Sequence, residues 1–175
     1  AWLLRYPDAA MRARLPDIHT VLRAPGNGLS ARRRVELDIL MDRLLADGIE
    51  AEARYVELFD RGRGTALHLF EHVHGDSRDR GPAMIDLVQT YEEAGLLLGP
   101  EELPDHLTVL LEYASTQPPA QARAFIGEFT HIIAAIAESL RRRDSDYVAV
   151  MAVLLDLAGG QSEAGTAAVA DDEPL

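Results

Sequence analysis

Apolar residues recur every three or four positions along nearly the whole chain. This spacing places them on one face of an α-helix, whereas no segment shows the sustained alternation of apolar and polar residues that is typical of a half-buried β-strand. No internal repeat of fixed length is evident. The sequence therefore predicts an all-α fold, a single-domain bundle of about eight to ten helices.

The strongest helical pattern runs from Pro118 to Arg142, where we expect one continuous helix that begins at a proline pair and ends at a run of arginines. Ser30 is suited to cap a helix over residues 31–47, which Gly48 would end. Four residues of that helix are predicted to face the core: Val35, Ile39, Leu40 and Leu44. Further helices are predicted over residues 84–98, 107–114 and 147–158.

The composition excludes several classes of protein. The 175 residues carry a net charge of −12 and contain no cysteine, so disulfides and thiolate metal sites are excluded. Such an acidic chain is poorly suited to nucleic acid or to an anionic membrane surface. No apolar stretch approaches the roughly 20 residues that cross a bilayer, and the first residues lack a signal-peptide pattern. We therefore expect a soluble, cytoplasmic protein with no nucleic-acid partner and no direct membrane insertion.

Residues 159–175 differ from the rest because they are small, acidic and unpatterned. We expect an acidic, disordered tail there, following an all-helical domain over residues 1–158. The arginine runs 32–34 and 141–143 are predicted to lie on solvated helix faces.

The segment from Tyr55 to Gly81 departs from the bundle pattern because it gathers three histidines, four arginines and five acidic residues in 27 positions. Residues 68–72, HLFEH, match the H-x-x-E-H pattern of inverted zincins, in which two histidines hold zinc and Glu71 would act as general base. The pattern is short and a third metal ligand cannot be singled out. The alternatives are histidines that hydrogen-bond locally at a helix–loop junction, and a binding surface.

Two neighbouring stretches have local structural explanations. The glycines of residues 61–65, RGRGT, match no phosphate-binding motif, and we expect a turn whose Thr65 caps the next helix. Pro104 is suited to the first helical position, with Asp105 behind it. Acidic residues surround His106 in the sequence and are expected to raise its pKa and to favour a cationic partner.

Three runs of sequence carry a family resemblance: YVELFDRGRGT (residues 55–65), LHLFEHVHGDSRDRGPAM (67–84) and ELPDHLTVLLEYAS (102–115). They resemble the NarJ-type chaperones of respiratory nitrate reductase, often called its delta subunit. The triplet at 104–106 also resembles the Pro-Asp-His signature of the wider TorD/DmsD group of redox-enzyme maturation chaperones. The likeness extends from LLRYPDA, residues 3–9, to the last predicted helix.

The resemblance implies a non-enzymatic, all-helical chaperone that retains no cofactor. Such proteins bind the N-terminal peptide of the catalytic (alpha) subunit and keep that subunit able to accept its molybdenum cofactor before membrane docking. They occur as monomers or domain-swapped dimers. The peptide-binding residues expected here are His68, Leu69, Phe70, Glu71, His72, Gly75, Asp76, Ser77, Arg78, Pro104, Asp105 and His106. Because imidazoles near carboxylates titrate near neutral pH, we hypothesise that protonation of the histidines tunes peptide affinity.

Overall fold

The protein is described here by a computed structural model that covers residues 1–74 and 77–159. Within these residues the chain forms ten α-helices and no strand, apart from one isolated bridge between His68 and His106, so the all-α prediction is confirmed. The helices are α1 (Ala9–Ala13), α2 (Leu15–Arg23), α3 (Ala31–Asp47), α4 (Ile49–Tyr55), α5 (Leu69–Val73), α6 (Arg80–Glu93), α7 (Leu107–Thr116), α8 (Pro119–Gly127), α9 (Thr130–Arg142) and α10 (Val148–Gly159). The predicted disordered tail lies outside the described residues, except for Gly159, which ends α10.

Three shorter turns connect these helices. A 3-10 turn, η1 (Trp2–Leu4), precedes α1; a π-type turn, η2 (Val56–Asp60), extends α4; and a second 3-10 turn, η3 (Arg63–Thr65), leads towards α5. No helix in the described ranges combines the length and the apolar character needed to cross a membrane.

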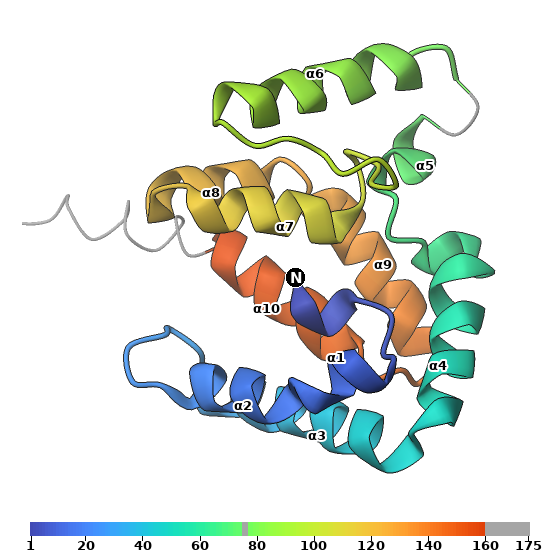
Figure 1. The fold of residues 1–175 in the computed structure, drawn as a ribbon, viewed down its shortest axis with the longest axis vertical. Helices are drawn as coiled ribbons and strands as arrows, with labels where there is room; N and C mark the ends of the chain where they lie inside the picture. Colours follow the sequence, from blue (N-terminus) through green and yellow to red (C-terminus); the bar gives the residue numbers. More distant parts are fainter. Residues whose placement is uncertain (75–76, 160–175) are drawn as a thin grey trace, which may run out of the picture.

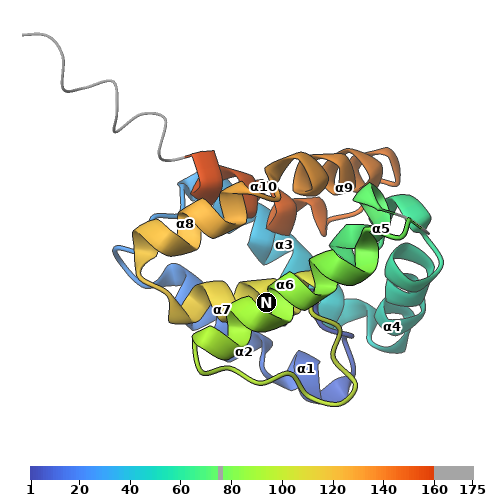
Figure 2. The same cartoon turned by 90° about the horizontal axis from the view of Figure 1, so that it is seen from above.

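Helix α10 lies at the centre of the bundle, packed against α3, α8 and α9 (Figure 1). Its sequence, VAVMAVLLDLAG, contains a single charged residue, and a helix that is apolar on nearly all sides is suited to a central position. Helices α7 and α8 pack side by side (Figure 2), and α2 packs on α3 (Figure 1). Helix α6 lies at the edge of the bundle opposite α2 and α3, with only Leu87 and Tyr91 buried.

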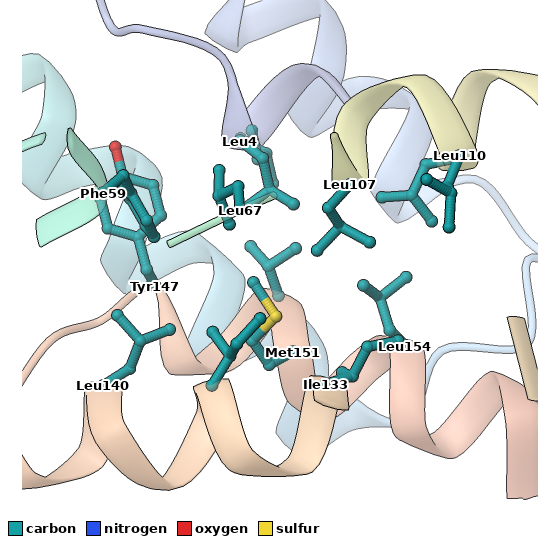
Figure 3. Packing of buried hydrophobic residues seen from close by; sticks show 14 of the residues in the cluster. Leu4, Phe59, Leu67, Leu107, Leu110, Ile133, Leu140, Tyr147, Met151 and Leu154 are labelled. Carbon is teal, nitrogen blue, oxygen red and sulfur yellow. The ribbon is translucent and has the colours of Figure 1, made fainter. Parts of the chain in front are cut away.

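The core draws residues from distant parts of the chain. Figure 3 shows Leu4 and Leu67, both in segments outside the long helices, packed above Met151 of α10 and beside Leu107 of α7. These four side chains are almost completely buried. The N-terminal turn and the segment before α5 are therefore parts of the core.

The predicted helix from Pro118 to Arg142 is wrong, because the chain breaks it into α8 and α9. At the break the backbone N–H groups of Glu128 and Phe129 bond three residues back, to Phe125 and Ile126, at 3.2 and 3.1 Å. The Thr130 hydroxyl donates to the carbonyl of Gly127 at 3.0 Å. The apolar stripe continues across the break, so the spacing alone cannot reveal it.

Helix α3 has the predicted boundaries but a different buried face. The Ser30 hydroxyl accepts the Arg33 N–H at 3.2 Å, and Gly48 ends the helix at a positive φ of 54°. Leu40 and Leu44 are buried as predicted, whereas Val35 and Ile39 are exposed. The buried stripe consists of Leu37, Leu40, Met41 and Leu44.

Two further expectations need correction. Helix α6 ends at Glu93, before Gly95 with its positive φ of 79°, instead of continuing to residue 98. Of the arginines at 32–34, Arg33 is largely shielded and bridges to Asp156 of α10 at 2.6 Å. That side chain links α3 to α10, so it does not lie on a solvated face.

Candidate functional site

His68, Asp105 and His106 come together where the segment before α5 runs alongside the segment before α7. We call these three residues the histidine cluster. The N–H of Leu69 donates to the carbonyl of Asp105 at 3.0 Å, and the N–H of Leu107 donates to the carbonyl of Leu67 at 2.8 Å. This antiparallel pairing holds the two imidazole rings edge to face, with 4.8 Å between their centroids.

Asp105 is the buried centre of the cluster, with no solvent exposure. Its Oδ2 accepts the N–H of Phe70, in the first turn of α5, at 3.1 Å. Its Oδ1 lies 3.6 Å from Nδ1 of His68, which suits an ion pair but is too long for a hydrogen bond. Burial by itself would raise the pKa of Asp105, but His68 and the Phe70 N–H outweigh it, so that the pKa lies below its usual value.

The pKa values of the two histidines in the cluster are shifted in opposite directions. The Asp105 carboxylate raises the pKa of His68 above its usual value, despite partial burial. Burial and the neighbouring charge of His68 lower the pKa of His106 to about 4. The expectation that acidic neighbours raise the pKa of His106 is therefore wrong, because the loss of hydration outweighs their attraction.

His106 acts as the N-cap of α7. Its Nδ1 accepts the N–H of Thr108 at 3.3 Å and lies 2.7 Å from the Thr108 hydroxyl, which fits a neutral ring with the proton on Nε2. Because α7 begins at Leu107, Pro104 does not occupy the predicted first helical position. Instead, the Pro104 carbonyl accepts the Tyr91 hydroxyl at 2.7 Å and so joins this segment to α6.

The other predicted binding residues divide into buried and exposed groups. Leu69 and Phe70 are buried in the core, whereas Glu71, Ser77 and Arg78 are exposed and His72 is half-buried. Gly75 and Asp76 lie outside the described residues.

The geometry does not support the zinc interpretation of residues 68–72. His68 is the N-cap before α5, so it does not share a helix face with His72. The Nε2 of His72 lies 2.8 Å from the carbonyl of Ala66, in a local hydrogen bond. Within residues 1–74 and 77–159, no three side chains of metal-binding type are grouped to hold an ion.

Thr65 stabilises the turn before α5 through hydrogen bonds of its side chain inside that turn. The expectation that Thr65 caps the next helix is therefore wrong. Its buried hydroxyl donates to the carbonyls of Leu58 and Gly62. A Cβ on Gly62 would collide with the Leu58 carbonyl and the Thr65 hydroxyl, so only glycine fits there.

A second feature, which the sequence analysis missed, is an apolar groove of about 640 Å³. Its walls come from η1, α2, α3, α7, α8 and α10. Its lining includes Trp2, Ile18, Val21, Ala114, Val153 and Leu157. The available signal was the set of apolar residues on α2 and the single tryptophan, but only the tertiary arrangement brings these walls together.

The sequence profile of the family described as "Nitrate reductase delta subunit" matches residues 8–153. The chain belongs to the nitrate reductase delta subunit family. A relative from Escherichia coli K12, "Nitrate reductase molybdenum cofactor assembly chaperone NarJ", is 42% identical over 156 residues, which is 89% of this chain and 66% of the relative. "Probable nitrate reductase molybdenum cofactor assembly chaperone NarW" of the same strain is 39% identical over 157 residues, which is 90% of this chain and 65% of NarW.

A more distant relative, "Probable nitrate reductase molybdenum cofactor assembly chaperone NarJ" of Bacillus subtilis, is 32% identical over 156 residues, which is 87% of this chain and 82% of the relative. The chain thus spans somewhat less than two-thirds of the two E. coli proteins and most of the B. subtilis protein.

In this member of the nitrate reductase delta subunit family, α7 joins the two features of the site. Its N-terminus is capped by His106 of the histidine cluster, and Leu111, Ala114 and Ser115 from its second half line the groove. The histidine cluster therefore lies at one end of a helix whose other end forms a wall of the groove.

Proposed function

We propose that this chain is an assembly chaperone for nitrate reductase. It binds the N-terminal peptide of the catalytic (alpha) subunit in the cytoplasm and keeps that subunit able to accept its molybdenum cofactor. The names of its relatives support this role. The chaperone performs no catalysis and retains no cofactor itself.

The apolar groove is the observation that carries the proposal. A cavity of about 640 Å³ with largely apolar walls suits the hydrophobic face of an amphipathic helix. Apart from the indole N–H of Trp2, the only polar side chains that line it within the described residues are those of Arg14, Asp17 and Ser115. A catalytic centre needs convergent acids, bases or nucleophiles, and this lining does not bring such groups together.

The charge of the protein favours the same occupant. With a net charge of −12, the surface attracts a basic peptide and repels an acidic one. An amphipathic helix with apolar residues on one face and basic residues on the other therefore complements both the groove and its surroundings.

The second candidate contact surface lies on and around α5, and we call it the signature surface. Its side chains reach the surface to different degrees and can contact the polar face of a peptide. They are those of His68, Glu71, His72, Ser77 and Arg78. Leu69 and Asp105 are buried, so any effect of theirs on binding passes through the fold. Tuning of affinity by histidine protonation and a monomeric or domain-swapped state remain predictions.

Calorimetric titration with a synthetic N-terminal peptide of the cognate catalytic subunit tests the proposal. Val21→Glu places a charge in the groove at a residue that is 68% exposed, and we expect it to weaken binding at least about tenfold. Val35→Glu is the matched control, because Val35 is 57% exposed on α3 and lies outside the groove.

Each outcome has a distinct meaning. Absence of saturable binding to the wild-type protein would overturn the proposed function. Normal binding by Val21→Glu together with a loss in Arg78→Glu would move the site from the groove to the signature surface.

A further inference from the structure

We propose that Trp2, Arg14 and Asp17 form a recognition edge along the groove that selects the charge pattern of the bound helix. The inference rests on the proposed function and adds the chemistry of the partner. The partner is an amphipathic helix that packs an apolar side chain on Trp2. It places an acidic residue opposite Arg14 and, about one turn away, a basic residue opposite Asp17.

Trp2 has the properties of an anchoring contact. It lines the groove and is 41% exposed, although the residues that follow it, Leu3 and Leu4, are buried. The Leu4 carbonyl accepts the Tyr55 hydroxyl at 2.7 Å, so the turn that carries Trp2 is fixed to the core. A rigidly held, half-exposed tryptophan beside an apolar cavity is the kind of residue that dominates binding energy at protein interfaces.

Two guanidinium groups hold the indole ring. The Cζ atoms of Arg5 and Arg14 lie 4.2 and 4.9 Å from its centroid. Arg5 also pairs with Glu112 of α7, which ties η1 to the wall of the groove. These contacts restrain the ring, which is still 41% exposed and is therefore available to a ligand.

Arg14 and Asp17 differ from their charged neighbours on the first two helices. Arg12 pairs with Glu52, and Arg23 pairs with Asp38. Neither Arg14 nor Asp17 forms an ion pair with any residue in the described part of the chain, and both line the groove. Arg14 is the N-cap of α2 and Asp17 lies in its first turn, so the groove carries a cation and an anion three residues apart, each without an ion-pair partner in the described part of the chain. They can therefore select both the direction and the register of a bound helix.

Fluorescence gives the first test, because Trp2 is the only tryptophan in the chain. Titration of the wild-type protein with a tryptophan-free N-terminal peptide of the catalytic subunit should shift its emission, with the same midpoint as calorimetry. Trp2→Ala should weaken binding about tenfold, whereas Trp2→Phe should stay within about threefold of wild type. Circular dichroism would verify that both variants remain folded.

Charge exchange gives the second test. Arg14→Glu and Asp17→Arg should each weaken binding about fivefold or more, and Arg32→Glu, on the exposed face of α3, should not. The double variant should regain affinity for a peptide in which one acidic and one basic residue have been exchanged, and for no peptide with a single reversal.

The two proposals fail in different ways. A wild-type protein that binds no peptide overturns the proposed function and this inference with it. A wild-type protein that binds, with unchanged emission and with Trp2→Ala as tight as wild type, overturns this inference alone. Failure of every exchanged peptide to restore binding to the double variant also overturns it.

Discussion

Nδ1 of His68 lies 3.6 Å from Oδ1 of Asp105, a carboxylate with no exposure to solvent. The same carboxylate accepts the N–H of Phe70, so one side chain serves both the start of α5 and the adjacent imidazole. Both the start of α5 and the charge of His68 therefore depend on Asp105.

Asp105→Ala should lower the free energy of unfolding by about 2–3 kcal/mol, because it leaves the buried Phe70 N–H without an acceptor and His68 without its anion. Asp105→Asn should cost less, since an amide oxygen can still accept the N–H. Urea denaturation measures both values. Ser77→Ala, at an exposed position, is the control, and equal midpoints for Asp105→Ala and wild type would contradict the prediction.

NMR titration should show His68 titrating above its usual value of 6.5 and His106 remaining neutral until the pH approaches about 4. The raised pKa of His68 stabilises the fold fully below pH 6.5, and this contribution is lost as the pH rises through the folded-state value. The lowered pKa of His106 has the opposite sign: its contribution is present above pH 6.5 and is lost as the pH falls towards about 4. In Asp105→Asn the His68 resonance should titrate at lower pH, and an unchanged value would contradict the assignment.

Gly62→Ala should destabilise the protein by about 1–3 kcal/mol, because the new methyl group meets the Leu58 carbonyl and forces the turn to shift. Gly127→Ala is the matched substitution, since a Cβ there meets nothing within 4 Å. It should leave stability unchanged or increase it by up to about 1 kcal/mol. Thermal unfolding of the two variants side by side distinguishes them, and similar melting temperatures would argue against the predicted clash.

Arg33→Ala should lower the free energy of unfolding by about 1 kcal/mol. The reason is that the Arg33 guanidinium connects α3 to Asp156 of α10 through hydrogen bonds of 2.6 and 3.2 Å. Arg32→Ala removes an arginine that is 80% exposed, and we expect little change. Chemical denaturation in low salt measures the difference, which should shrink in high salt. Two indistinguishable variants would show that the link contributes nothing to stability.

Local sequence patterns predicted where helices occur better than they predicted which face of a helix is buried or where a long helix is interrupted. Ser30 and Gly48 mark α3 because a cap and a positive φ depend on neighbouring residues alone. Val35 and Ile39 were misplaced because either of two adjacent apolar stripes satisfies helical spacing, and only the packing partner selects one. The break between α8 and α9 near Gly127 could not be predicted, because the apolar stripe continues across it.

The candidate site shows the same limit. Sequence composition located the histidine cluster, since His68, Asp105 and His106 stand out from the bundle pattern. It could not give the sign of the His106 pKa shift, because burial depends on the tertiary structure. The groove escaped prediction altogether, since its walls are separated by more than a hundred positions and meet only after folding.

Helix α7 has ten residues and is therefore about 15 Å long, so one short helix connects the groove to the histidine cluster. A peptide that displaces α7 at Ala114 would change the surroundings of the imidazoles of His106 and His68 at the other end of the helix. The NMR signals of the ring protons of these two histidines would then report binding in the groove, without any label on the peptide.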